Sequence, residues 1–169
     1  MGPCAGGAVY SPALTDFIFM TKNTSYMFVT GPNVVKTVTN EEVTAEELGG
    51  AEAHMVKSGV THFACENELD TIENLKTLLS YIPQNCEEIP GNLPYDFQDE
   101  KRPELNLLIP ENPNHPYDVR EIIHHLSDSG SFFEVHKEFA ENIVIGFARL
   151  AGRSIGTVSY THLTLPTKA

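Results

Sequence analysis

A glycine-rich turn in the first sixteen residues, MGPCAGGAVYSPALTD, places the strongest constraint on how this chain folds. Gly2, Gly6 and Gly7 form the tightest glycine cluster in the sequence, and an apolar run suited to a helix follows. Glycine lets the backbone bring N–H groups close to a ligand, and a helix that begins there adds a partial positive charge. Such a turn can hold a developing oxyanion, although close packing or a simple turn is the ordinary structural interpretation. The spacing is not GxGxxG and lacks the GKS or GKT of a P-loop, which argues against a nucleotide site.

The composition excludes several classes of function. The 169 residues carry a formal net charge of −12 and no basic run, which argues against nucleic acid or an anionic membrane as a partner. Three widely spaced cysteines, Cys4, Cys65 and Cys86, contain no CxxC motif and indicate a reducing compartment. The chain lacks a stretch of about eighteen apolar residues, so the sequence predicts no membrane-spanning helix.

Short apolar runs alternate with turn residues and favour a layered α/β arrangement. The expected strands are 17–20, 26–30, 60–64 and 142–150. The expected helices are 8–14, 34–38, 68–81 and 117–126, with further helix starts at 39–42 and 44–47. Helix 68–81 is the clearest, because its apolar residues recur every three or four positions to form one stripe, Leu69, Ile72, Leu75, Leu78 and Leu79. Gly152 and Arg153 predict a hairpin turn into 154–156.

Two long motifs identify a family. GPCAGGAVYSPALTDFIFM and YMFVTGPNVVKTVTNEEVTAEELGGAEAHMVKSGVTHFACEN closely resemble the carboxyltransferase (β) subunits of biotin-dependent acyl-CoA carboxylases, above all those of the propionyl-CoA carboxylase type. Related decarboxylases and transcarboxylases share these motifs. The resemblance runs from Met1 to about Gly156 and weakens between Pro83 and Pro116. It implies an α/β fold of the crotonase-like ββα spiral type.

The resemblance also predicts how the chain is divided. We expect 1–83 to be the C-terminal part of the N-terminal (acyl-CoA) carboxyltransferase domain and 117–156 to begin the C-terminal domain. Seven of the eleven prolines lie in 83–116, so 84–116 is expected to be an interdomain linker. Residues 157–169 contain VSYTHLTLPT, which resembles a translated sequencing adapter, and are expected to be foreign to the family. The chain is therefore expected to be an internal fragment.

The reaction implied by the resemblance is carboxyl transfer from carboxybiotin to the α-carbon of a short-chain acyl-CoA, with propionyl-CoA the leading substrate. Backbone N–H groups of Ala5, Gly6 and Gly7 match the family's thioester oxyanion site. Tyr10, Ser11 and Pro12 follow the turn closely enough to be acyl-CoA-binding candidates. A second oxyanion site, for biotin, is expected outside this chain, so the fragment is expected to be inactive alone.

The implied partners are the acyl-CoA substrate, a biotin carboxylase or biotin carrier subunit or domain, and further β subunits in a homo-oligomer. No metal is expected, and the expected compartment is the cytoplasm, or the mitochondrial matrix in a eukaryote. Two alternatives stay open. One is a methylmalonyl-CoA decarboxylase or transcarboxylase subunit, and the other is a non-catalytic crotonase-like CoA-binding module.

Other reactive side chains have ordinary structural interpretations. Cys4 lies beside the turn, but no motif supplies a base to activate it, so a buried structural cysteine is the better interpretation. His124 and His125 point about 100° apart on a helix and make a poor metal site. The acidic pairs at 41–42 and 46–47 are expected to lie in first helical turns, where the helix dipole favours carboxylates.

Overall fold

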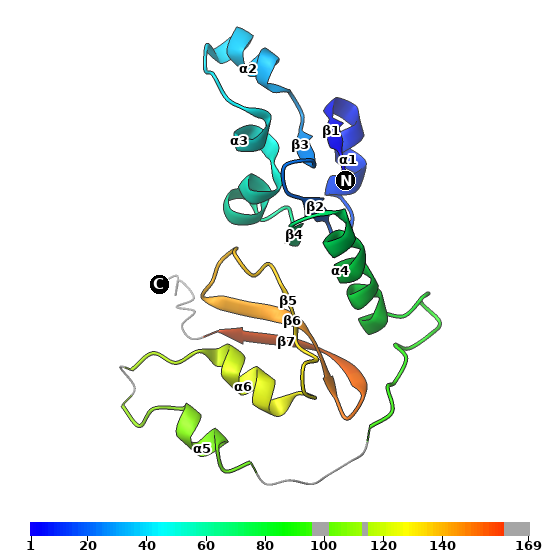
Figure 1. The fold of residues 1–169 in the computed structure, drawn as a ribbon, viewed down its shortest axis with the longest axis vertical. Coiled ribbons are helices and arrows are strands. Elements are labelled where there is room, and N and C mark those ends of the chain that lie inside the picture. The colour runs from blue at the N-terminus through cyan, green and yellow to red at the C-terminus, as the bar shows by residue number, and fades with distance from the viewer. Residues whose placement is uncertain (96–101, 113–114, 161–169) are drawn as a thin grey trace, which may run out of the picture. The chain divides into compact units, whose positions relative to one another are not determined.

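The computed structural model describes residues 1–95, 102–112 and 115–160. The described chain divides into two compact units. The first comprises Met1–Lys76 together with His136–Phe139, and the second comprises the other described residues from Thr77 onward. Both units mix helices and strands (Figure 1), which confirms the expected α/β class.

The first unit is built on two parallel strand pairs. β1 (Pro3–Ala5) pairs with β3 (Tyr26–Phe28), and β2 (Phe19–Thr21) pairs with β4 (Phe63–Cys65). Three of the expected strands therefore exist, but each is shorter than its apolar run. Parallel partners far apart in sequence need crossover connections, and here helical segments provide them.

Helical segments follow the strands of this unit. They are the 3₁₀ helix η1 (Gly6–Val9), α1 (Tyr10–Ala13), α2 (Pro32–Thr39), α3 (Ala45–Gly49), the π-helical segment η2 (Ala53–Ser58) and the part of α4 (Glu68–Tyr81) that precedes Thr77. The helix start expected at 39–42 is wrong, because Asn40 adopts φ 60° and ends α2. The start at 44–47 is confirmed by a capping box, in which Thr44 and Glu47 satisfy each other's backbone N–H groups.

The core of the first unit is small. Val9, Ile18, Met20, Met27 and Ala51 form its buried apolar cluster. Gly49 lies so close to β3 that a Cβ would come within 2.2 Å of the Met27 carbonyl oxygen, which explains why the end of α3 needs glycine. Because Val9 belongs to this cluster, the core holds in place the helical segment η1 that follows β1.

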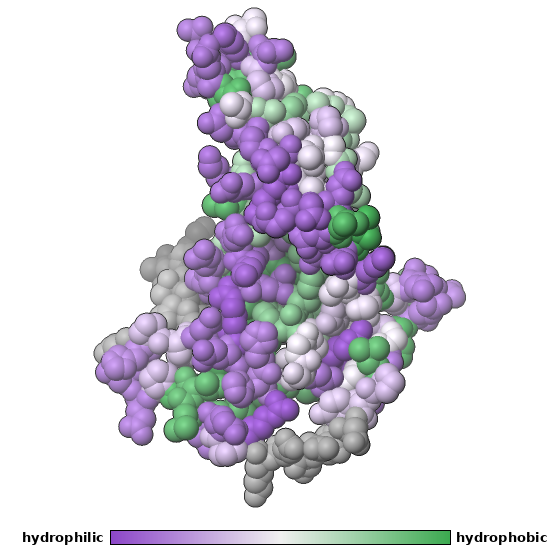
Figure 2. All heavy atoms as spheres, viewed as in Figure 1, coloured by the Kyte–Doolittle hydropathy of each residue, from purple (hydrophilic) through white to green (hydrophobic). Residues whose placement is uncertain are grey.

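The bounds of α4 agree with the sequence expectation, but its apolar stripe is not a core face. Leu78 is buried, whereas Leu69 is 74% exposed and Leu79 is 56% exposed. On the face of the molecule shown in Figure 2, hydrophilic residues predominate over both units, and hydrophobic residues form separate patches. No helix among the described residues has the length and apolarity required to cross a membrane.

The second unit contains an antiparallel sheet in the order β5–β6–β7, with α5 (Leu105–Leu108) and α6 (Val119–Leu126). The strands are β5 (Phe133–Val135), β6 (Ile143–Leu150) and β7 (Arg153–Tyr160). The hairpin exists, but its turn is Ala151-Gly152 rather than Gly152-Arg153. Both turn residues have positive φ, 51° and 75°, as the type I′ geometry requires.

The boundaries expected between domains remain predictions. Within the expected linker, α5 forms and the Leu93 N–H donates to the Gly152 carbonyl at 3.0 Å, so part of 84–116 packs against the hairpin. β7 continues past Gly156 to Tyr160, which pairs with Ile143. Backbone hydrogen bonds hold this extension whatever its origin, and the rest of the expected foreign tail, 161–169, lies outside the described residues.

Candidate functional site

The glycine turn joins a strand to a helical segment. Ala5 is extended, with ψ 156°, and Gly6 takes φ 64°, a conformation that side chains other than glycine rarely adopt. Gly6 and Gly7 then begin η1, which α1 extends to Ala13. The first N–H groups of a helical segment have no partner within it, so Gly6, Gly7 and Ala8 offer donors at this end. The geometry fits a turn that binds an anion through uncharged backbone N–H donors.

The surface of this turn is open. Ala5 and Gly7 are exposed, and Gly6 is half-buried. A Cβ built on Gly7 would meet no described atom within 4 Å, and one on Gly6 would meet only the Val29 carbonyl oxygen at 4.0 Å. A ligand can therefore approach the backbone here without displacing a side chain.

The Cys4 side chain links the two ends of the glycine turn. Its thiol donates a hydrogen bond to the Ala8 carbonyl oxygen at 3.2 Å, and the side chain packs against the buried core cluster. The half-buried thiol thus spans Gly6 and Gly7 and ties β1 to η1. This contact agrees with the structural interpretation of Cys4 rather than with a nucleophile.

Tyr10, Ser11 and Pro12 lie in α1, directly after the turn. Tyr10 is 57% exposed, Ser11 is exposed and Pro12 is half-buried. The Ser11 and Pro12 carbonyls accept the backbone N–H groups of Leu14 and Thr15. These three residues share the segment with the glycines, and their contact with a ligand stays a prediction.

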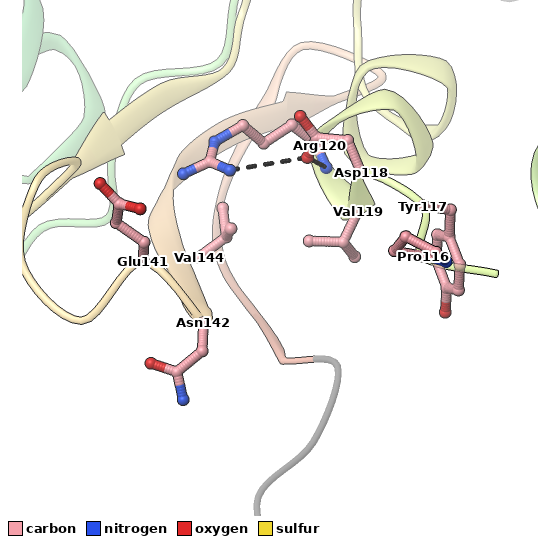
Figure 3. Close-up of a pocket in the computed structure, with 8 residues that line it drawn as sticks. All are labelled: Pro116, Tyr117, Asp118, Val119, Arg120, Glu141, Asn142 and Val144. Carbon is pink, nitrogen blue, oxygen red and sulfur yellow. Dashed lines mark hydrogen bonds and ion pairs between the residues drawn. The ribbon is translucent and has the colours of Figure 1, made fainter. Parts of the chain in front are cut away.

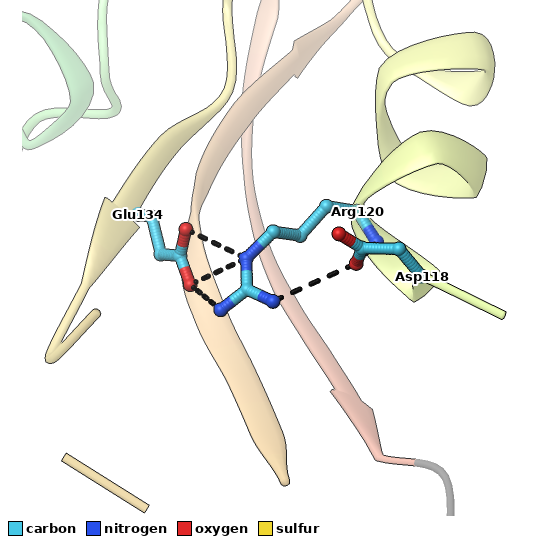
Figure 4. A network of polar contacts seen from close by, with 3 residues as sticks. All are labelled: Asp118, Arg120 and Glu134. Carbon is cyan, nitrogen blue, oxygen red and sulfur yellow. Dashed lines mark hydrogen bonds and ion pairs between the residues drawn. The ribbon is translucent and has the colours of Figure 1, made fainter. Parts of the chain in front are cut away.

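A second feature, which the sequence did not suggest, lies at the start of α6. A cavity of about 350 Å³ is lined by residues at the start of α6 and the start of β6, namely Pro116, Tyr117, Asp118, Val119, Arg120, Glu141, Asn142 and Val144 (Figure 3). Arg120 donates through Nη2 to Glu134 at 2.6 Å and lies 3.5 Å from Asp118 (Figure 4). The guanidinium of Arg120 is therefore already paired and does not present a free charge to a ligand. Its hydrogen bonding to the Glu134 carboxylate is the main cause of its raised pKa.

The acidic pairs differ in role. Glu47 forms the capping box, and its hydrogen bonds from the Thr44 backbone and side chain lower the pKa of its carboxyl group. The dipole interpretation of 46–47 is therefore confirmed. That of 41–42 is wrong, since this pair lies outside any helix and Glu42 instead pairs with Lys36 at 2.6 Å.

The histidines do not gather as metal ligands. Among residues 1–95, 102–112 and 115–160, no group of three or more His, Cys, Asp and Glu side chains could hold a metal ion. Nδ1 of His125 donates to the Glu121 carbonyl oxygen of its own helix at 2.7 Å, while the His124 ring packs on Phe132. His62 and His136 lie far apart in the sequence but their rings are in contact, and no sequence pattern predicted this contact.

Comparisons with known proteins identify the family of the chain. Residues 1–163 match the family described as carboxyl transferase domain. The chain is 55% identical to the propionyl-CoA carboxylase beta chain of Roseobacter denitrificans, over 98% of this chain and 32% of that protein. It is 53% identical to the methylmalonyl-CoA decarboxylase subunit alpha of Veillonella parvula, over 94% of this chain and 31% of that protein. The chain thus spans about a third of the length of these relatives.

A solved structure gives the same result for the fold. The transcarboxylase 12S structure, described as a hexamer assembly with hydrolysed methylmalonyl-coenzyme A bound, superposes with a TM-score of 0.90 at 48% identity. The match covers 94% of this chain and 31% of that chain. A single-chain, multi-domain long-chain acyl-CoA carboxylase shares the fold at a TM-score of 0.75 and 22% identity.

Proposed function

Because the chain belongs to the carboxyl transferase domain family, we propose that it forms part of a biotin-dependent acyl-CoA carboxyltransferase subunit, with propionyl-CoA as the substrate. The observation that carries the proposal is the open strand–turn–helix at Ala5, Gly6 and Gly7. The substrate follows the names of the relatives, which include propionyl-CoA carboxylase beta chains at 50–55% identity.

The turn stabilises charge on the thioester. Removal of a proton from the α-carbon of an acyl-CoA moves negative charge onto the thioester oxygen. The N–H groups of Gly6 and Gly7 donate to that oxygen, and the absence of side chains on both residues lets it come within hydrogen-bond distance. Each such donor is worth about 3–4 kcal/mol in an oxyanion hole. This chain therefore contributes preorganised donors and no nucleophile.

Biotin is not a group that the turn itself holds. Carboxybiotin, carried on a partner subunit or domain, supplies the carboxyl group that is transferred. The neutral N–H donors of the turn suit one thioester oxygen, and we assign the donors for the biotin ureido oxygen to no residue of this chain. Tyr10, Ser11 and Pro12 lie next to the turn and are proposed to contact the acyl-CoA.

The finer fold and the assembly belong to the same proposal. Two parallel strand pairs with helical crossovers fit a crotonase-like ββα spiral, represented by parts of two domains. The proposed partners are a biotin carboxylase or biotin carrier subunit and further copies of the subunit. The transcarboxylase 12S structure is described as a hexamer, which supports a homo-oligomer. The proposed location is the cytoplasm, or the mitochondrial matrix in a eukaryote, as the name of the human relative indicates.

A decarboxylase or transcarboxylase subunit is the second candidate. It is supported by 53% identity to a methylmalonyl-CoA decarboxylase subunit and 48% identity to transcarboxylase 12S. All three reactions use an enolate of the same acyl-CoA, so the turn serves each of them equally. Assays with the different carboxyl donors and acceptors distinguish these reactions.

A proline substitution tests the donor role. In a full-length subunit that carries this segment, assembled with its biotin-bearing partner, Gly7→Pro removes one N–H in a first helical turn, where proline is tolerated. We expect kcat/KM for the acyl-CoA to fall by about 10²- to 10³-fold.

The matched control is Glu68→Pro, which removes an exposed first-turn N–H from α4. Activity should be unchanged in this control. Unchanged kcat/KM in Gly7→Pro would overturn the proposal. Acyl-CoA binding without turnover by the unsubstituted full-length subunit would favour the non-catalytic CoA-binding module.

A further inference from the structure

His62 and His136 form a stacked pair within the first unit. Their ring centroids lie 4.2 Å apart at an interplanar angle of 38°, and the His136 N–H donates to the His62 carbonyl oxygen at 3.2 Å. The His136 ring also lies 5.9 Å from the Phe139 ring. A Cβ on Gly59 would come within 2.7 Å of Phe139, so this ring is tightly seated. The segment His136–Phe139 is therefore held on the first unit by ring contacts together with this backbone hydrogen bond.

The proton on His62 is fixed by its neighbours. The backbone N–H of Ile18 donates to Nδ1 of His62 at 3.1 Å, so this nitrogen is an acceptor and the ring proton of the neutral form is on Nε2. A second proton on Nδ1 would face the Ile18 N–H and break that hydrogen bond. Ile18 is a buried core residue directly before β2, so the bond also positions the strand.

His136 is equally unsuited to a second proton. Its Nδ1 atom is buried and has no hydrogen-bond partner among the described residues. Its backbone adopts φ 57°, in the left-handed region. Charging the imidazole would place a buried N–H donor without an acceptor beside the His62 ring, which costs free energy.

We propose that the His62–His136 stack is an acid-sensitive latch that holds His136–Phe139 on the first unit when both rings are neutral and releases this segment when either ring is protonated. Burial lowers the pKa of His62, and the neighbouring His136 lowers it further. Burial also lowers the pKa of His136, which a backbone hydrogen bond at Thr61 partly offsets. Both shifts agree with neutral rings at pH 7.

The charged groups around the latch are engaged with each other. Lys22, directly after β2, pairs with Glu66, which follows β4, and hydrogen bonding to Glu66 is the main cause of the raised pKa of Lys22. Glu138, in the latch segment itself, and Glu52 also act on Lys22. The titratable group that acts electrostatically on His62 is His136. Protonation of the pair is thus the event that changes charge at the stack.

Amide hydrogen exchange on the full 169-residue chain tests the latch. After correction for intrinsic exchange rates, we expect the protection of 136–139 to fall severalfold between pH 7 and pH 5, because the released rings, with ordinary histidine pKa values, bind protons more readily than the packed rings. His136→Phe keeps a ring without a titratable group, and His136→Asn suits the positive φ. In both variants protection should fall clearly less over this range, because His62 is then the one ring of the pair that still titrates.

His115→Phe is the control, because His115 is exposed and outside the stack. It should keep the pH dependence of the unsubstituted chain. Protection of 136–139 that does not change with pH in the unsubstituted chain would overturn the latch. An unaltered pH dependence in both His136 variants would also overturn it. These outcomes do not depend on carboxyltransferase activity.

Discussion

The guanidinium of Arg149 lies over the ring of Tyr81, with Cζ 4.8 Å from the ring centroid. Arg149 is only 4% exposed, and it donates to the carbonyl oxygens of Ser80, Gly91 and Gly152 at 2.7, 3.2 and 3.1 Å. This buried cation joins the end of α4, the following loop and the β6–β7 hairpin. It holds the second unit together through carbonyl groups and a ring.

Arg149→Met should therefore destabilise the chain. The substitution keeps much of the apolar volume but removes the Arg149 donor from three carbonyl oxygens, of which that of Gly152 keeps its hydrogen bond from the Leu93 N–H. This loss should lower the free energy of unfolding by on the order of 3 kcal/mol. Urea unfolding measures this change, with Arg153→Met at an exposed position as the control. A loss below about 0.5 kcal/mol would show that Arg149 is not a central support.

Tyr81 predicts a response to alkaline pH. Burial is the main cause of its raised pKa, and Arg149 partly opposes it. An acid whose pKa is higher in the folded state stabilises the fold below the unfolded value, about 10, and this contribution is lost as pH rises through the folded pKa. Absorbance titration should show one tyrosine ionising late, and Tyr81→Phe should remove that component. Its persistence in Tyr81→Phe would refute the assignment.

The buried hydroxyls of Thr21 and Thr71 should be energetically coupled. Their Oγ1 atoms lie 2.8 Å apart. The Thr71 hydroxyl donates its proton to the Asn67 carbonyl oxygen at 2.9 Å, so in the pair the Thr21 hydroxyl donates and Thr71 Oγ1 accepts. A double-mutant cycle with Thr21→Val and Thr71→Val should give a coupling of about 1 kcal/mol in urea unfolding. Additive effects would mean that the hydroxyl pair contributes nothing to joining β2 and α4.

The cysteines should differ in reactivity. Cys86 is exposed, whereas Cys65 is buried and its pKa is raised mainly by desolvation. Because the thiolate is the reactive form, alkylation at pH 7.5 should modify Cys86 at least about tenfold faster than Cys65. Mass spectrometry of tryptic peptides measures both rates in one sample. Equal rates would contradict the burial of Cys65.

Local patterns predicted the elements that local chemistry determines. The spacing of leucines and the stop at Pro83 gave the bounds of α4, and Thr44 with Glu47 gave the start of α3. The helix start at 39–42 failed because Asn40 takes a left-handed conformation, which residue type alone does not decide. Exposure of Leu69 shows that an apolar period predicts a face but not its partner.

Contacts between distant residues could not be predicted in this way. The sequence indicated Gly6 because few other residues tolerate positive φ at a turn. Nothing in the spacing linked His62 with His136 or Arg120 with Glu134, because tertiary packing brings these pairs together. The chemistry of the turn came from the resemblance to a family, and its open backbone is the structural observation that agrees with it.

The most direct test of the proposed oxyanion role is infrared spectroscopy of bound substrate. Propionyl-CoA labelled with ¹³C at the thioester carbonyl is added to a full-length subunit carrying this segment, and the same is done with Gly7→Pro. Donation from the Gly6 and Gly7 N–H groups should shift the carbonyl stretch to lower wavenumber, and Gly7→Pro should reduce that shift because the Gly6 donor alone remains. A carbonyl band at the same position in both proteins, or unshifted from free substrate in the unsubstituted subunit, would contradict the account.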